Sequence, residues 1–206
     1  MLSTGVARRS SKPQTRSMPT RQLFPTLLYE AEIDRDLLPE LAHSIRSLAA
    51  DDGAGRRWSK EHRYAGYTSY ASLNDLPRRD PAFAELAKLL NRHVLDFVRE
   101  SGWQVKPKLD SLWANVLKGG GHHTGHIHPH SILSGTLYVE VPSGSGPIRF
   151  EDPRLPMMMA APTRDDAFVT VAPRPGLLLL WESWLRHEVL PGSGKGDRLS
   201  VSFNFA

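Results

Sequence analysis

Five of the nine histidines of this 206-residue chain lie within nine consecutive positions, residues 122–130. His126 and His128 are two residues apart, so on a β-strand both side chains point to the same face of the sheet. Two imidazoles on one face can bind one metal ion, and a third ligand can complete a facial triad with free positions opposite. His187 is the candidate third ligand, because the other histidines outside the cluster fall in segments with helical character.

The spacing of the histidines leaves other interpretations open. A histidine-rich segment can be a solvated loop, or an adventitious metal site without chemistry. His128 and His130 are also two residues apart and form an alternative pair of ligands. We favour His126 with His128, because Pro129 is expected to turn the chain directly after them.

Arg198 and Ser200 follow His187 on what is predicted to be the last strand. Their spacing of two residues places them on one face of that strand, together with Ser202 and Asn204. A guanidinium and a hydroxyl directed into a pocket bind a carboxylate, since arginine matches the two carboxylate oxygens with two hydrogen bonds. The same face, turned outward, would place Arg198 in a surface salt bridge. We favour the inward orientation.

Residues 103–206 are predicted to supply the strands that position these side chains. Short apolar or alternating runs are separated by glycine and proline clusters, a spacing typical of a β-sandwich or jelly roll. The eight predicted strands span residues 109–118, 123–128, 132–141, 147–151, 167–171, 177–181, 185–190 and 198–205.

The preceding segment is predicted to support this β-roll with helices. A strand is expected over residues 23–33, a helix after Asp34, a loop at 51–57, and a second helix that begins at Asp80-Pro81 and ends near Gly102. The expected fold is therefore mainly β with flanking helices (α+β). It is a double-stranded β-helix (jelly roll, cupin-like) that N-terminal helices buttress, with the other end open as a pocket.

The composition of the chain narrows the function classes. The chain has no cysteine, which excludes disulfides, zinc thiolate sites, iron–sulfur clusters and a thiol nucleophile. Residues 1–22 hold five of the 26 basic residues and no acid, so the remainder is close to neutral, with 21 basic and 22 acidic residues. We expect no nucleic-acid partner, no membrane span and a cytoplasmic location.

The chain is predicted to have two parts. Residues 1–22 are expected to be a disordered basic N-terminal tail, with an organelle transit peptide as the alternative. Residues 23–206 are expected to form a single domain, with helical support over about 34–102 and the β-roll over about 103–206.

The stretch from about Leu112 to Phe205 resembles the 2-oxoglutarate and Fe(II)-dependent oxygenases of the prolyl-4-hydroxylase-like superfamily. The shared motifs come in order: Trp113-Ala114-Asn115, His126-Ile127-His128-Pro129, Ser134–Val139, Phe150–Arg154, Pro173 and Gly176 before Leu177–Leu180, Trp184–His187 and Arg198-Leu199-Ser200. The first metal motif of the superfamily is usually His-x-Asp, so His128 stands where an aspartate is expected, in a His-x-His variant.

The resemblance implies a set of site residues. Catalytic and metal-binding roles fall to His126, His128 and His187, which would bind Fe(II). Cosubstrate binding falls to Arg198, Ser200, Tyr138 and, as a weaker candidate, Asn115. The aromatic residues Tyr67, Tyr70, Trp113 and Trp184 are candidates for lining the substrate entrance, although core packing is the more expected role for each of them taken singly.

The resemblance also implies a reaction. The chain is expected to be a dioxygenase that uses Fe(II), O2 and 2-oxoglutarate and hydroxylates an unidentified substrate with release of succinate and CO2. A small-molecule or amino-acid-type substrate and a homodimer fit this interpretation. The alternatives are a zinc-dependent hydrolase or hydratase with three histidine ligands, and a non-catalytic metal-binding β-roll protein.

Overall fold

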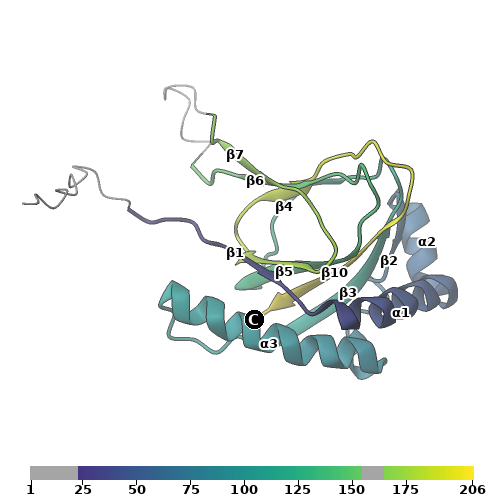
Figure 1. The fold of residues 1–206 in the computed structure, drawn as a ribbon, viewed down its shortest axis with the longest axis horizontal. Coiled ribbons are helices and arrows are strands. Elements are labelled where there is room, and N and C mark those ends of the chain that lie inside the picture. Colours follow the sequence, from purple (N-terminus) through teal and green to yellow (C-terminus); the bar gives the residue numbers. More distant parts are fainter. Residues whose placement is uncertain (1–22, 155–164) are drawn as a thin grey trace, which may run out of the picture.

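Two antiparallel β-sheets facing each other form the body of the molecule, with helices on one side (Figure 1). This computed structural model describes residues 23–154 and 165–206. The predicted tail at residues 1–22 lies outside the described residues. The expected mainly β fold with flanking helices, a jelly roll, is confirmed.

The larger sheet has six strands in the order β1-β8-β5-β10-β3-β2. Its strands are β1 (Leu28–Glu32), β8 (Leu177–Glu182), β5 (Leu133–Glu140), β10 (Arg198–Phe205), β3 (Leu109–Leu117) and β2 (Gly66–Thr68). The leucine run of β8 is fully buried because this strand lies inside the sheet, between β1 and β5. Strand β2 was not predicted, since a three-residue polar strand has no clear sequence pattern.

The smaller sheet has four strands in the order β4-β9-β6-β7. These strands are β4 (His123–His126), β9 (His187–Val189), β6 (Ile148–Glu151) and β7 (Phe168–Val171). All eight strands predicted after residue 103 are present, with ends that differ by a few residues. The smaller sheet pairs the early histidine segment, β4, with the strand β9, which lies some 60 residues later in the chain.

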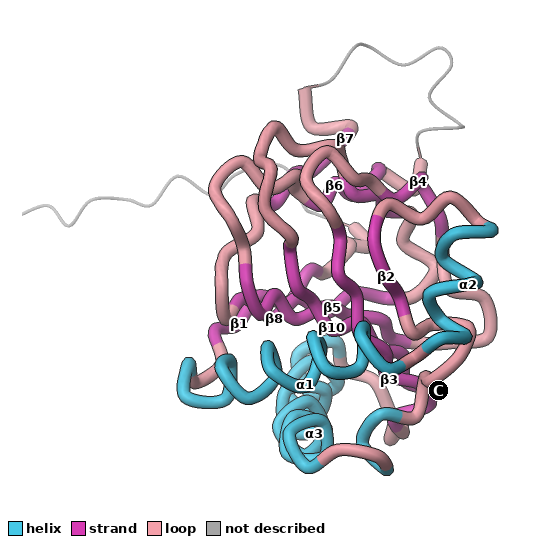
Figure 2. The backbone as a smooth tube through the Cα atoms, turned by 90° about the vertical axis from the view of Figure 1, so that its right-hand side faces the viewer, coloured by secondary structure: helices cyan, strands magenta, loops and turns pink. Residues whose placement is uncertain are grey.

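Helices α1 (Leu38–Asp51) and α3 (Pro81–Ser101) cover the outer face of the six-stranded sheet, away from β4, β6 and β7 (Figure 2). Both predicted helices are confirmed, and short 3-10 turns precede them at Arg35–Leu37 and Leu76–Arg78. The Asp80 carboxylate accepts a hydrogen bond from the Ala82 amide, and Gly102 ends α3 in the left-handed conformation. No helix in the described ranges is long and apolar enough to cross a membrane.

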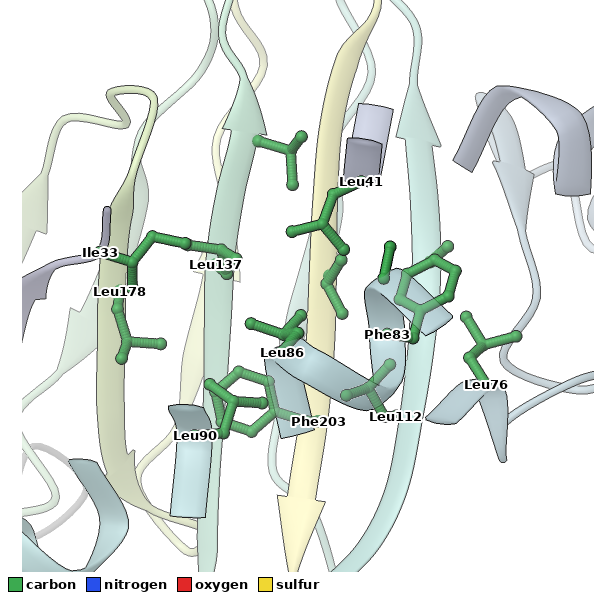
Figure 3. Close-up of a cluster of buried hydrophobic side chains, with 14 of the residues drawn as sticks. Ile33, Leu41, Leu76, Phe83, Leu86, Leu90, Leu112, Leu137, Leu178 and Phe203 are labelled. Atoms are coloured by element: carbon green, nitrogen blue, oxygen red, sulfur yellow. The ribbon is translucent and has the colours of Figure 1, made fainter. Parts of the chain in front are cut away.

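The core lies between these helices and the larger sheet. Leu86 and Leu90 of α3 and Leu41 of α1 meet Leu137 and Phe203 of the sheet, and all five side chains are fully buried (Figure 3). This layer holds one face of the larger sheet in place, so the opposite face of β3, β10 and β5 is free to line a cavity.

The predicted loop at residues 51–57 is wrong, because residues Gly53–Glu61 form helix α2. Two glycines in three residues favoured a loop. Asp52 caps the helix by accepting a hydrogen bond from the Gly55 amide, and it also accepts one from the Tyr67 hydroxyl at 2.9 Å. A Cβ at Gly55 would lie 2.3 Å from the Asp52 carboxylate. Tertiary packing, and not a turn, therefore requires this glycine.

We expect the substitution Leu86→Ala to lower the free energy of unfolding by about 2–5 kcal/mol, because it leaves a cavity in the layer between α3 and the sheet. The same exchange at Leu95, which is exposed on the same helix, should change it by less than about 0.5 kcal/mol. Urea denaturation of the two variants measures both values. Equal losses at the two positions would contradict this location of the core.

Candidate metal centre

Three histidine side chains meet in the space between the two sheets. His126 on β4 and His187 on β9 are direct partners in the antiparallel pairing of these strands, and His128 follows two residues later. One ring nitrogen from each of the three histidines lies within 4.8 Å of the others. The structure thus brings together all three residues that the sequence proposed as ligands.

The segment after β4 places His128 and keeps His130 away. Strand β4 ends at His126, and the backbone amide of His128 donates a hydrogen bond to the carbonyl of Ser183. Pro129 and His130 then turn the chain, with His130 at a positive φ of 71°. His130 does not belong to the three-histidine group, so the alternative pair of His128 and His130 is not formed.

Hydrogen bonds to backbone carbonyls orient two of the imidazole rings. The Nδ1–H of His126 donates to the carbonyl of Thr124 at 2.8 Å, and that of His187 donates to the carbonyl of Leu185 at 2.9 Å. With the proton on Nδ1, each ring presents the lone pair of Nε2 to the centre of the group. A carbonyl partner of this kind is the usual support for a metal-binding histidine.

The three nitrogens fit a divalent transition metal. The Nε2 atoms of His128 and His187 are 3.3 Å apart. Two neighbouring ligands about 2.1 Å from one ion would be separated by roughly 3.0–3.4 Å. Imidazole nitrogens suit iron and zinc, and three ligands on one side of an ion leave the other side open.

Burial keeps two of these histidines uncharged. Desolvation, with a smaller contribution from the nearby His126, lowers the pKa of His187 from 6.5 to about 3 and the pKa of His128 from 6.5 to about 4. His187 has 5% of its surface exposed. A neutral imidazole is the form that binds a metal, so these rings are ready for an ion at neutral pH.

The free energy of unfolding of the metal-free protein should fall as the pH drops below about 6.5. The unfolded chain protonates its histidines near pH 6.5, whereas the folded chain leaves His128 and His187 neutral until about pH 3–4, so the unfolded state binds more protons. The loss approaches about 1.4 kcal/mol per pH unit for each histidine. Urea denaturation with a chelator at pH 7.0, 6.0 and 5.0 measures it.

The variant His128→Gln should reduce this pH dependence, while the same exchange at His43, exposed on α1, should preserve it. An unfolding free energy that is constant from pH 7.0 to 5.0 would contradict the neutral state of the buried histidines.

The three histidines line a cavity of about 330 Å³. One wall comes from adjacent strands of the larger sheet, where Asn115 of β3, Ser200 of β10 and Tyr138 of β5 are aligned in register. Arg198, at the start of β10, lines the same cavity and has only 4% of its surface exposed. The inward orientation of the Arg198 face is therefore confirmed.

Arg198 retains a free hydrogen-bond donor in this buried position. Its Nη1–H donates to the Gly146 carbonyl at 2.9 Å, whereas its Nε–H has no partner among the described residues. The guanidinium carbon lies 5.4 Å from the centre of the Tyr138 ring, and burial raises the pKa of Tyr138 to about 12, so its hydroxyl stays a donor. A buried cation that lacks a carboxylate partner fits an anionic ligand.

Asn115 is hydrogen-bonded on two sides within the cavity wall. Its carbonyl oxygen accepts a hydrogen bond from the Thr68 hydroxyl at 2.8 Å, and its amide nitrogen donates to the Ser202 hydroxyl at 3.1 Å. The side chain lines the cavity, but these bonds connect three strands of the sheet. Asn115 therefore supports the wall, and its role in cosubstrate binding stays a prediction.

The residues that line the cavity include several that were not predicted from the sequence, among them Trp58, Tyr64 and His123. His123 shares a hydrogen bond of 3.0 Å between its Nε2 and the Tyr64 hydroxyl. Strand alternation predicts opposite faces for His123 and His126, but the pairing register shifts between them. An irregularity of this kind brings both residues to the cavity, and sequence spacing does not reveal it.

The predicted entrance residues divide into two groups. Tyr70 and Trp113 line the cavity as expected. Tyr67 does not, because it is buried against Asp52. Trp184 lines a neighbouring hollow of about 570 Å³, which shares Ile127, His128 and Pro129 with the cavity. Tyr67 therefore has the core-packing role that was expected for each of these residues taken singly, and an entrance role for Trp184 stays a prediction.

A family model described as "Putative 2OG-Fe(II) oxygenase" matches residues 111–204, which include the three histidines and Arg198. No curated protein is significantly similar to the sequence.

Solved structures share the fold. A Pseudomonas putida prolyl-4-hydroxylase superposes with a TM-score of 0.63 at 17% identity, covering 87% of this chain and 92% of that chain. The non-heme alpha ketoglutarate dependent epimerase SnoN from nogalamycin biosynthesis gives 0.61 at 18% identity, covering 87% and 76%. HygX from Streptomyces hygroscopicus, with nickel and 2-oxoglutarate bound, gives 0.57 at 15% identity, covering 88% and 82%.

Proposed function

We propose that residues 23–206 act as one oxygenase domain. The premise is the family match over residues 111–204, which makes this chain a member of the 2OG-Fe(II) oxygenase family. The family uses Fe(II), 2-oxoglutarate and O2, and the chain is accordingly an oxidoreductase. The proposed reaction hydroxylates a small-molecule or amino-acid-type substrate and releases succinate and CO2.

One observation supports this proposal above the others. The three-histidine group and the buried, incompletely paired Arg198 line the same cavity. A metal alone needs only the histidines, and a carboxylate alone needs only the arginine. A cosubstrate that reaches a metal with one end and carries a carboxylate at the other needs both.

The proposed roles of the lining residues follow from their chemistry. His126, His128 and His187 would hold the iron, and their neutral rings leave its charge to be balanced by the cosubstrate. Arg198 would bind the distal carboxylate of 2-oxoglutarate, with hydroxyl donors from Tyr138 and Ser200 on the same sheet wall. When bound, iron and 2-oxoglutarate supply the oxidation of a substrate C–H bond by O2. The protein orients the reactants and excludes water from the buried end of the cavity.

The metal charge distinguishes this site from the usual His-x-Asp arrangement. With His128 in place of a carboxylate, three neutral ligands leave the full 2+ charge of the metal. A bound 2-oxoglutarate dianion balances it, so cosubstrate and metal should bind cooperatively. Isothermal titration of 2-oxoglutarate with and without a metal ion should show tighter binding in the presence of the metal.

The proposed function is tested by following 2-oxoglutarate and succinate by NMR. Succinate should form only when Fe(II), O2 and 2-oxoglutarate are all present. Protein purified without added metal should be analysed for its metal content in parallel, because three histidines also form zinc sites. Tightly bound zinc, with no succinate after reconstitution with iron, would contradict the oxygenase assignment.

A further inference from the structure

Three aromatic side chains touch in series along the cavity and lead to His128. Trp58 of α2, Tyr70 after β2 and Trp113 of β3 all line the cavity. The ring centres are 6.3 Å apart between Trp58 and Tyr70 and 5.2 Å apart between Tyr70 and Trp113, both edge to face. The ring of Trp113 lies 6.1 Å from that of His128. We call Trp58, Tyr70 and Trp113 the aromatic wall.

The rest of the protein holds the aromatic wall in place. Trp58 stacks on His62 with ring centres 4.1 Å apart, and Trp113 has only 6% of its surface exposed. Tyr70, between them, is 50% exposed, and its backbone amide donates a hydrogen bond to the Thr68 hydroxyl at 3.2 Å. The wall thus presents a pre-ordered, incompletely covered aromatic surface beside the metal centre, and a pre-ordered surface binds a ligand at a small entropic cost.

The charges of the cavity restrict what this wall can bind. Among the described residues that line the cavity there is no carboxylate, and Arg198 is its one permanently charged side chain. A loaded site would contain a 2+ metal, three neutral histidines, the 2-oxoglutarate dianion and Arg198, which sum to one positive charge. A cationic ligand would be repelled and would lack a counter-ion.

An anionic ligand meets a different obstacle. The faces of aromatic rings carry negative charge density, so they attract neutral rings and cations and not anions. Since Arg198 is assigned to the cosubstrate, no further cation among the lining residues is available to an anionic substrate.

We propose that the aromatic wall is the substrate-binding surface of this cavity, and that the substrate is an uncharged molecule with a planar, unsaturated ring that packs against Tyr70 and Trp58. This inference rests on the proposed oxygenase function, because that function assigns Arg198 and the metal to the cosubstrate. The substrate ring would lie on the wall, with the carbon to be oxidised directed toward the metal centre.

Three probes with the same naphthalene ring system test whether the substrate must be uncharged: 2-naphthylethanol, 2-naphthylacetate and 2-naphthylethylamine. They are titrated by saturation-transfer NMR into protein loaded with Zn(II) and 2-oxoglutarate, which does not turn over. The neutral alcohol should bind about 3- to 10-fold more tightly than either charged probe. Cyclohexylethanol, which has the same polar group without an aromatic ring, should bind more weakly than the naphthyl alcohol.

Variants of the wall test its location. Tyr70→Leu and Trp58→Leu should each weaken binding of the naphthyl alcohol about 3- to 10-fold, the value of one aromatic contact. Tyr70→Phe should bind it as the unsubstituted protein does, because the ring is kept. Trp184→Leu is the matched control, since this tryptophan is 47% exposed and lines the neighbouring hollow.

Several results would overturn the inference. Binding that is lost in Trp184→Leu but kept in Tyr70→Leu would place the substrate in the neighbouring hollow. A preference for either charged probe would refute the substrate class, and so would the absence of binding of all the naphthyl probes at millimolar concentration. Titration of 2-oxoglutarate in the same samples separates the two proposals. If 2-oxoglutarate does not bind, the proposed function fails, and titration of the probes into protein with Zn(II) alone still tests the wall.

Discussion

The variant Arg198→Ala should weaken 2-oxoglutarate binding by at least about 30-fold while the metal centre stays intact. Arg198 is nearly fully buried, and its Nε–H has no partner among the described residues. A charge-assisted pair in such a site contributes about 2–5 kcal/mol when one partner is removed, which corresponds to roughly 30- to 5,000-fold in affinity. Isothermal titration of 2-oxoglutarate into the metal-loaded variant measures the change.

Two further variants make this result specific. Arg198→Lys keeps the charge but loses the two-pronged geometry, so its affinity should lie between those of the alanine variant and the unsubstituted protein. Arg174→Ala is the matched control, because Arg174 forms an exposed ion pair with Glu32 at the protein surface. Metal affinity should be unchanged in the control. Unaltered 2-oxoglutarate affinity in Arg198→Ala would show that the cosubstrate assignment is wrong.

The variant His128→Ala should lower the affinity for Fe(II) by at least about 100-fold, because even the loss of a supporting hydrogen bond around a metal site costs 10- to 100-fold. The affinity for Fe(II) should fall most. The affinity for 2-oxoglutarate should fall as a secondary effect, because the lost metal is its ionic partner. Competition with a coloured chelator measures the metal affinity.

The variant His128→Asp supplies the critical comparison. A carboxylate at this position restores the His-x-Asp pattern and adds one negative charge, so metal binding should be retained. The cooperativity between the metal and 2-oxoglutarate should fall, since the dianion no longer has to balance the full metal charge. His130→Ala, at an exposed position in the following turn, should bind metal normally. If His128→Ala also binds metal normally, His128 is not a ligand.

The local sequence pattern was sufficient to predict most of the helices and strands. Alternation and short apolar runs predict strands because successive side chains of a strand point to opposite faces. The Asp80-Pro81 start and Gly102 end of α3 were predictable because caps depend on neighbouring residues alone. Helix α2 and strand β2 were not predictable, because both depend on contacts with distant residues, such as the hydrogen bond from Tyr67 to Asp52.

The same division applies to the site. The spacing of Arg198 and Ser200 determined that these side chains share a face, since the two-residue period of a strand is a local property. His128 lies beyond the end of β4, so its position beside His126 depends on the hydrogen bond from its amide to the Ser183 carbonyl. The pairing of His126 with His187, the inward direction of Arg198 and the register shift that admits His123 were decided by the tertiary structure.

The physical reason is that the sequence and the tertiary structure specify different properties of the site. A sequence states the chemistry of the donors and their local periodicity, so by itself it determined a candidate set of three nitrogens and one guanidinium. Strand pairing and sheet packing decide which faces meet, how deeply a charge is buried and which aromatic rings adjoin the metal centre. Only the folded structure therefore shows that the three histidines, Arg198 and the aromatic wall line one cavity.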